Sequence, residues 1–152
     1  VLRITRPHQK AMNRFYTMCG EVLKQVKDSA YLGVTLSEDL NWAPHIGNTA
    51  LKANRSLGYL RRNLKHCPMK LKETAYFSMV RSIMEYSCQI WDPYLEKDKK
   101  VLETVQRRAA RFVKYDYGRT SSVDNMIKEL EWTSLEIRRR EARLALLYNI
   151  IV

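Results

Sequence analysis

The chain has few of the residues that stabilise small secreted domains. Its 152 residues include three cysteines, Cys19, Cys67 and Cys88. Their odd number and wide spacing argue against a disulfide framework and favour a reducing compartment, so we expect structural thiols. Long apolar runs are also missing, which predicts neither a membrane span nor a signal peptide. Because both ends lack the usual terminal signals, we expect the chain to be cut from a longer protein.

Carboxylates are missing from a long part of the sequence. No acidic residue occurs between Asp39 and Glu73, although seven lysines and arginines lie in that interval. The net charge is +11, while 45% of residues are hydrophobic and 10% aromatic, which is typical of a folded basic domain and not of a disordered tail. Such a charge favours a polyanionic partner. We expect a nucleic acid, with an anionic membrane surface as the second alternative.

Clusters of catalytic residues are missing too. Two-metal phosphoryl transfer needs grouped carboxylates, and no two aspartates are adjacent here. His66 and Cys67 have Cys88 as a potential neighbour, but a structural zinc site also needs a second pair of ligands. Asp116 in the loop before Gly118 is expected to be a turn residue. We therefore predict that the chain contains no catalytic residue, metal ligand or cofactor.

Strand signals are confined to the first residues of the chain. Residues 1–6 are rich in β-branched side chains and alternate in polarity. Residues 15–18 and 21–26 flank a Cys19-Gly20 turn, which predicts a hairpin. A further strand is expected over residues 30–36, ending at a polar turn.

From Trp42 onward the sequence predicts helices. Residues 44–64 carry one apolar stripe: Ile46, Ala50, Ala53, Leu57, Leu60 and Leu64. Residues 69–87 carry apolar side chains around most of the circumference, so we expect this helix to be the most buried: Leu71, Ala75, Tyr76, Phe77, Met79, Val80, Ile83 and Met84. A third helix over residues 97–114 has these side chains inward: Val101, Leu102, Val105, Ala109, Phe112 and Val113.

Two serine-containing caps precede the last predicted helices. Residues 121–124 and 133–136 have the spacing of a capping box. We expect a mainly α fold, with a short N-terminal β-hairpin or strand element followed by a bundle of about four or five helices. The predicted domains are residues 1–42 and residues 43–152.

Basic residues gather at helical spacing on three predicted helices. On the first, Lys52, Arg55, Tyr59 and Arg62 share the face opposite the apolar stripe, with Arg61 and Lys65 nearby, which favours contact with phosphates over a merely solvated surface. A weaker second cluster comprises Arg107, Arg108, Arg111 and Lys114. On the last helix, Glu136 and Glu141 alternate with basic residues, which indicates ion pairs within the helix: Arg138, Arg139, Arg140 and Arg143.

Several short motifs follow one another along nearly the whole chain. The N-terminal ones are VLRITR at 1–6, YLGVTL at 31–36, DLNW at 39–42 and HI at 45–46. The later ones are KANRSLGYLRRNL at 52–64, VRSIMEY at 80–86, IWDP at 90–93 and VQRRAARFV at 105–113. In this order, they resemble the end of the reverse transcriptase domain of non-LTR (LINE-type) retrotransposons of the jockey and chicken-repeat kind.

The resemblance implies a role for each predicted domain. Residues 1–42 would be the strand-rich end of the palm, with a primer-grip element at Tyr31, Leu32, Gly33 and Val34. Residues 43–152 would be the thumb. The family's paired catalytic aspartates, which lie upstream in the polymerase, have no counterpart in this chain, so it is expected to be inactive alone, and the Mg²⁺ of the parent enzyme would bind elsewhere.

The implied partners are an RNA template and a DNA primer, as an RNA–DNA duplex, and the upstream palm and fingers of the same polyprotein, with no membrane. The implied location is intracellular, in cytoplasm and nucleus. Charge and resemblance agree on a grip by backbone contacts, in which base identity matters little. Two alternatives remain open: a basic helical module that binds an acidic protein, and an active enzyme fragment.

Overall fold

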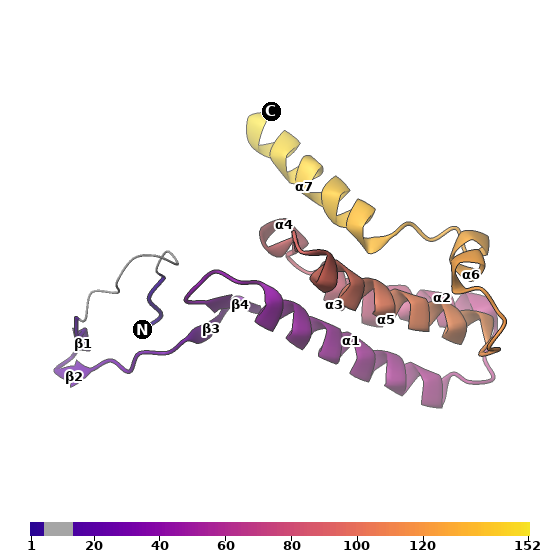
Figure 1. Ribbon diagram of the computed structural model, residues 1–152, viewed down its shortest axis with the longest axis horizontal. Helices are drawn as coiled ribbons and strands as arrows, with labels where there is room; N and C mark the ends of the chain where they lie inside the picture. Colours follow the sequence, from indigo (N-terminus) through magenta and orange to yellow (C-terminus); the bar gives the residue numbers. More distant parts are fainter. Residues whose placement is uncertain (5–13) are drawn as a thin grey trace. The chain divides into compact units, whose positions relative to one another are not determined.

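The computed structural model describes residues 1–4 and 14–152. The chain divides into two compact units, Val1–His45 and Ile46–Val152 (Figure 1). Short antiparallel strand pairs lie in the first unit, and helix α1 (Ala43–Asn63) begins close to the boundary. The helices that follow confirm the expected mainly α fold with a short strand element at its N-terminal end.

The described residues of the first unit form two hairpins. β1 (Thr17–Met18) pairs with β2 (Glu21–Val22), which confirms the predicted hairpin with shorter strands. β3 (Asp28–Tyr31) pairs with β4 (Val34–Ser37), so the single strand expected over residues 30–36 is wrong. Leu32 (φ 46°) and Gly33 (φ 81°) are both left-handed, and two such residues reverse the chain in a two-residue hairpin turn. A continuous strand cannot pass through them.

The strand expected at residues 1–6 is only partly described. Leu2 forms an isolated parallel bridge with Val26, and the Val26 amide donates to the Val1 carbonyl at 3.0 Å. Residues 5 and 6 lie outside the described part of the chain.

The helices lie close to their predicted positions. After α1 come α2 (Met69–Tyr76), η1 (Phe77–Arg81), α3 (Ser82–Glu85), α4 (Cys88–Trp91), α5 (Glu96–Lys114), α6 (Val123–Glu129) and α7 (Leu135–Ile151). Ser122 and Ser134 cap α6 and α7, since their side chains accept hydrogen bonds from the amides of Asn125 and Ile137. A serine cap precedes each helix as expected, but it lies one residue after Ser121 and Thr133, which the capping-box spacing indicates.

Helix α5 occupies the centre of the second unit. Helices α2, α6 and α7 all pack on it. Its buried apolar side chains are Leu102, Val105, Ala109, Ala110, Phe112 and Val113. Val101, expected to point inward, is instead 41% exposed.

The helix expected over residues 69–87 is not the most buried one. Its described burial follows a single stripe, in which Tyr76, Val80 and Met84 are fully buried, while Leu71 and Met79 are 49% and 43% exposed. The prediction is wrong because apolar side chains also cover much of the surface of folded proteins, so an apolar circumference does not require burial.

A π-helical turn keeps this buried stripe straight. Its members recur every fourth residue, and four residues of an α-helix exceed one turn by about 40°. The η1 segment forms hydrogen bonds to the fifth residue and so has more residues per turn, which offsets that drift. Tyr76, Val80 and Met84 therefore lie on one side of the helix that α2, η1 and α3 form together.

Candidate nucleic-acid interface

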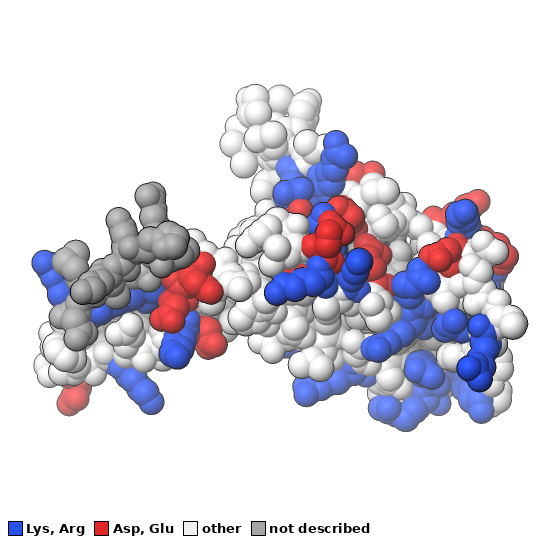
Figure 2. Space-filling view, viewed as in Figure 1, with Lys and Arg blue, Asp and Glu red and all other residues white. Residues whose placement is uncertain are grey.

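Helix α1 presents cations on the side opposite its buried stripe. Ile46, Ala50, Ala53, Leu57 and Leu60 are buried as predicted. Lys52, Arg55 and Arg62 are exposed, and Tyr59 is 53% exposed. Figure 2 shows lysine and arginine side chains gathered over α1, at the lower right of the view.

The cations of this face have no acidic neighbour to neutralise them in the described part of the chain. Among the described residues, no carboxylate forms an ion pair with Lys52, Arg55 or Arg62. The helix itself contains no acidic residue. Their charge is therefore available to a ligand. We call Lys52, Arg55, Tyr59 and Arg62 the basic face of α1.

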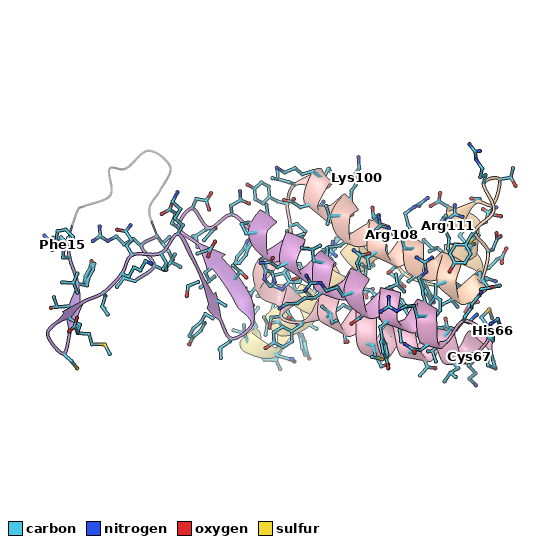
Figure 3. The ribbon with its side chains drawn as sticks, turned by 90° about the horizontal axis from the view of Figure 1, so that it is seen from below. Phe15, His66, Cys67, Lys100, Arg108 and Arg111 are labelled. Atoms are coloured by element: carbon cyan, nitrogen blue, oxygen red, sulfur yellow. The ribbon has the colours of Figure 1, made fainter. Side chains whose placement is uncertain are left out.

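The second predicted cluster divides into two parts. Arg107 forms an ion pair with Asp124, and the Lys114 amine lies 2.8 Å from a Glu129 carboxylate oxygen, so α6 neutralises both. Arg108 and Arg111 lie on another side of α5, in line with Lys100 (Figure 3). Arg108 donates to the Asn54 side chain at 2.9 Å, which shows that this side faces α1.

The predicted ion pairs within the last helix are wrong. Arg138 binds Glu85, Arg139 and Arg143 bind Asp92, and Glu136 binds Lys99. All four pairs join α7 to other elements. These residues fix the packing of α7 and are not part of the basic face.

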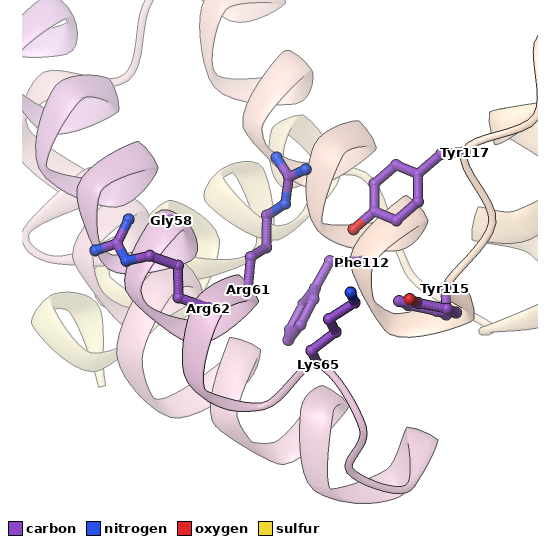
Figure 4. Close-up of a pocket in the computed structure, with 7 residues that line it drawn as sticks. All are labelled: Gly58, Arg61, Arg62, Lys65, Phe112, Tyr115 and Tyr117. Carbon is purple, nitrogen blue, oxygen red and sulfur yellow. The ribbon is translucent and has the colours of Figure 1, made fainter.

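The C-terminal ends of α1 and α5 enclose a pocket of about 380 Å³ (Figure 4). Its lining combines cations with aromatic rings: Gly58, Arg61, Arg62, Lys65, Phe112, Tyr115 and Tyr117. The Arg61 guanidinium lies 5.2 Å from the centre of the Tyr117 ring, a cation–π contact. No carboxylate is among the lining residues. We call this site the α1–α5 pocket.

The loop after α5 fixes the two tyrosines of the α1–α5 pocket. The Asp116 carboxylate accepts hydrogen bonds from the Gly118 amide and the Ser121 hydroxyl, both at 2.9 Å. These bonds, the Gly118 one foremost, lower the pKa of Asp116. A Cβ on Gly118 would lie 2.7 Å from the Ser121 hydroxyl and 3.2 Å from the Asp116 carboxylate, so a larger residue there would disturb these hydrogen bonds. Asp116 is thus a turn residue, as predicted.

A buried lysine lies behind the rings. Lys72 is only 4% exposed, and its amine lies 4.8 Å from the centre of the Tyr115 ring and 5.7 Å from that of Phe112. Tyr115 is left-handed (φ 53°) at the C-terminal cap of α5, a conformation that is unfavourable for a bulky residue. The surrounding contacts therefore hold this ring in place at a conformational cost.

The sequence identified the cations of this region but not the rings. Arg61 and Lys65 were expected to bind nucleic acid, whereas Phe112 was assigned to the core and Tyr115 and Tyr117 to a loop. Two tyrosines that flank a turn aspartate directly after a basic helix are a usable signal. Their position beside α1 cannot be predicted from the sequence, because it depends on how α1 and α5 pack.

The residues expected to form the primer grip lie in the first unit. Tyr31, Leu32, Gly33 and Val34 form the tip of the β3–β4 hairpin, and Val34 alone of them is buried. The cysteines are free: Cys88 is buried, Cys67 is half-buried, and Cys19 is exposed, which does not favour the structural role expected for it. The described residues contain no group of three or more histidine, cysteine or acidic side chains placed to hold a metal ion. No helix in the described part of the chain is long enough and apolar enough to cross a bilayer.

Comparison with known proteins finds one informative relative. A probable RNA-directed DNA polymerase from transposon BS of Drosophila melanogaster is 28% identical over 97 residues, which make up 62% of this chain and 11% of that protein. The chain resembles part of a transposon polymerase. This likeness supports a region related to reverse transcriptases. No protein-family model and no solved structure matches the chain.

Proposed function

We propose that this chain is part of a retrotransposon reverse transcriptase of the non-LTR type and that its helices grip the template–primer duplex. The observation that carries the proposal is the basic face of α1, whose cations have no carboxylate partner among the described residues. Cations in this arrangement bind phosphates regardless of base sequence. The likeness to a transposon polymerase makes an RNA–DNA duplex the favoured polyanion.

The remaining parts of the proposal follow the resemblance. Residues 43–152 act as the thumb, and residues 1–42 end the palm, with Tyr31, Leu32, Gly33 and Val34 at the primer grip. The catalytic aspartates and Mg²⁺ belong to the upstream palm and fingers, so the chain alone does not incorporate nucleotides. The complete polymerase acts inside the cell, in cytoplasm and nucleus.

The test is duplex affinity over a series of salt concentrations. Each phosphate contact contributes close to one unit to the slope of log affinity against log salt. Replacing Lys52, Arg55 and Arg62 together with alanine should lower the slope by about two to three units and weaken binding equally across sequences. Fluorescence anisotropy with a blunt RNA–DNA duplex provides the measurement.

The matched control removes the same charge elsewhere. Lys97, Lys128 and Arg140 are exposed on α5, α6 and α7, and replacing them with alanine also lowers the net charge by three. This control should leave the slope nearly unchanged, because a local contact and not total charge determines it. Equal slopes for both triple variants, or tighter binding of an acidic peptide than of the duplex, would contradict the proposal.

A further inference from the structure

The α1–α5 pocket has the size and lining of a site for a small anionic group with a flat ring. Its volume of about 380 Å³ is within the range of small-molecule sites. Cations on α1 line one side, and aromatic rings after and on α5 line the other (Figure 4). The absence of a carboxylate from this lining argues against a cationic ligand. A nucleotide carries both groups: a phosphate, which suits the cations, and a flat base, which suits the rings.

The aromatic side of the pocket is formed before any ligand binds. Tyr115 and Tyr117 are 51% and 47% exposed, and their rings meet edge to face at 83° with centres 6.1 Å apart. The rings thus form a corner, in which a base stacked on one meets the edge of the other. Since the Asp116 turn fixes both residues, little conformational entropy is lost on binding.

The cationic side lies within reach of the same corner. Arg61 already touches the Tyr117 ring, and Lys65 extends between Phe112 and Tyr115 in Figure 4. Arg62 lines the pocket and also belongs to the basic face of α1. The two surfaces are therefore continuous, so a strand that follows the basic face can enter the pocket.

We propose that the α1–α5 pocket binds one unpaired nucleotide of a nucleic-acid strand, with its base in the corner of Tyr115 and Tyr117 and its phosphate on Arg61 and Lys65. A paired base does not qualify, because its faces are covered by its neighbours in the duplex. Stacking on aromatic side chains is the usual way in which proteins hold single strands without reading sequence. The inference rests on the proposed function in one respect: the unpaired strand extends from the duplex that the basic face of α1 binds.

The experiment compares three probes on one duplex by fluorescence anisotropy: blunt ends, a short single-stranded overhang, and the same overhang with abasic sites. The abasic overhang keeps the phosphates and removes the bases, so it isolates stacking. The chain should bind the normal overhang about tenfold more tightly than the abasic one, as expected for one stacked base.

Two variants remove the pocket in different ways. Tyr117→Leu removes one ring. Gly58→Leu fills the space without a charge change, since a Cβ at Gly58 has only the Arg62 guanidinium within 4 Å, at 3.6 Å. Both should abolish the tenfold preference. Tyr94→Leu removes a 78% exposed ring elsewhere, and Gly47→Leu repeats the helical substitution where a Cβ meets nothing, so both should keep it.

The outcomes separate this inference from the proposed grip. Equal binding of normal and abasic overhangs, or a preference that survives both pocket variants, would overturn the inference while blunt-duplex binding could stand. Failure to bind the blunt duplex, together with a pocket-dependent preference for the overhang, would overturn the grip alone. Binding of adenosine monophosphate as tightly as the overhang would overturn the assignment to a strand in favour of free nucleotides.

Discussion

Arg139 is completely buried although it carries a full charge, and Asp92 is its carboxylate partner. The Arg139 Nε donates to Asp92 at 2.9 Å, while its two terminal nitrogens have no hydrogen-bond partner among the described residues. Arg143 lies 2.8 Å from the other Asp92 oxygen, but its side chain is 48% exposed. One partly buried carboxylate thus forms ion pairs with two cations, of which one is buried and the other half-exposed.

We predict that Asp92→Ala destabilises the chain by about 3–5 kcal/mol, because it leaves the buried Arg139 charge uncompensated. Arg143→Met, which removes only the exposed partner, should cost less than about 1 kcal/mol. Urea unfolding followed by circular dichroism measures both. The double variant Asp92→Ala, Arg139→Met should recover most of the loss, since an apolar replacement of a buried ion pair is often neutral. Equal effects of Asp92→Ala and Arg143→Met would disprove this assignment.

Helix α1 has a buried apolar stripe, but it also contains two glycines that lower the stability of the helix. A Cβ at Gly47 would meet no atom within 4 Å, and one at Gly58 would meet only Arg62 at an ordinary contact distance. Neither glycine has a positive φ. Their conformational freedom therefore costs helix stability without a steric need.

Gly47→Ala and Gly58→Ala should each raise the free energy of unfolding by about 0.5–1 kcal/mol. The two sites have no shared neighbour, so the gains should add. Urea unfolding of both single variants and the double variant tests this. A loss of stability in Gly58→Ala alone would mean that another element approaches the backbone there more closely than the structure shows.

The helices and their caps were predictable because their signals are local. The stripe from Ile46 to Leu60 and the helix starts near Ser122 and Ser134, predicted to within one residue, need only residues within a few turns. The contacts of α7 were not, because the partners of Arg138 and Arg139 lie 53 and 47 residues away in sequence. The α1–α5 pocket was missed for the same reason. Its cations were found on α1, whereas its rings required knowledge of which helices pack together.

Across the part of the chain that the structure describes, the charges are unevenly compensated. Most of the ion pairs that the structure records join α5, α6 or α7 to another element, and α1 contributes to none of them. The four cations of α1, Lys52, Arg55, Arg61 and Arg62, therefore have no carboxylate among the described residues to offset their charge. Like charges on one helix repel one another and destabilise the folded state. The surface proposed to bind phosphates is therefore expected to oppose folding when no ligand is present.

This conflict gives a prediction that needs no ligand. Replacing Lys52, Arg55 and Arg62 with alanine should stabilise the chain relative to the wild type at about 0.01 M salt, where the Debye length is about 30 Å. The gain should shrink at about 1 M, where the Debye length is about 3 Å and repulsion is screened. Alanine's better helix propensity adds a small constant that salt does not change, so the salt-dependent part isolates repulsion. Urea unfolding at both salt concentrations, with the Lys97, Lys128 and Arg140 triple variant as control, provides the measurement. A gain independent of salt would show that these cations do not repel one another in the folded state.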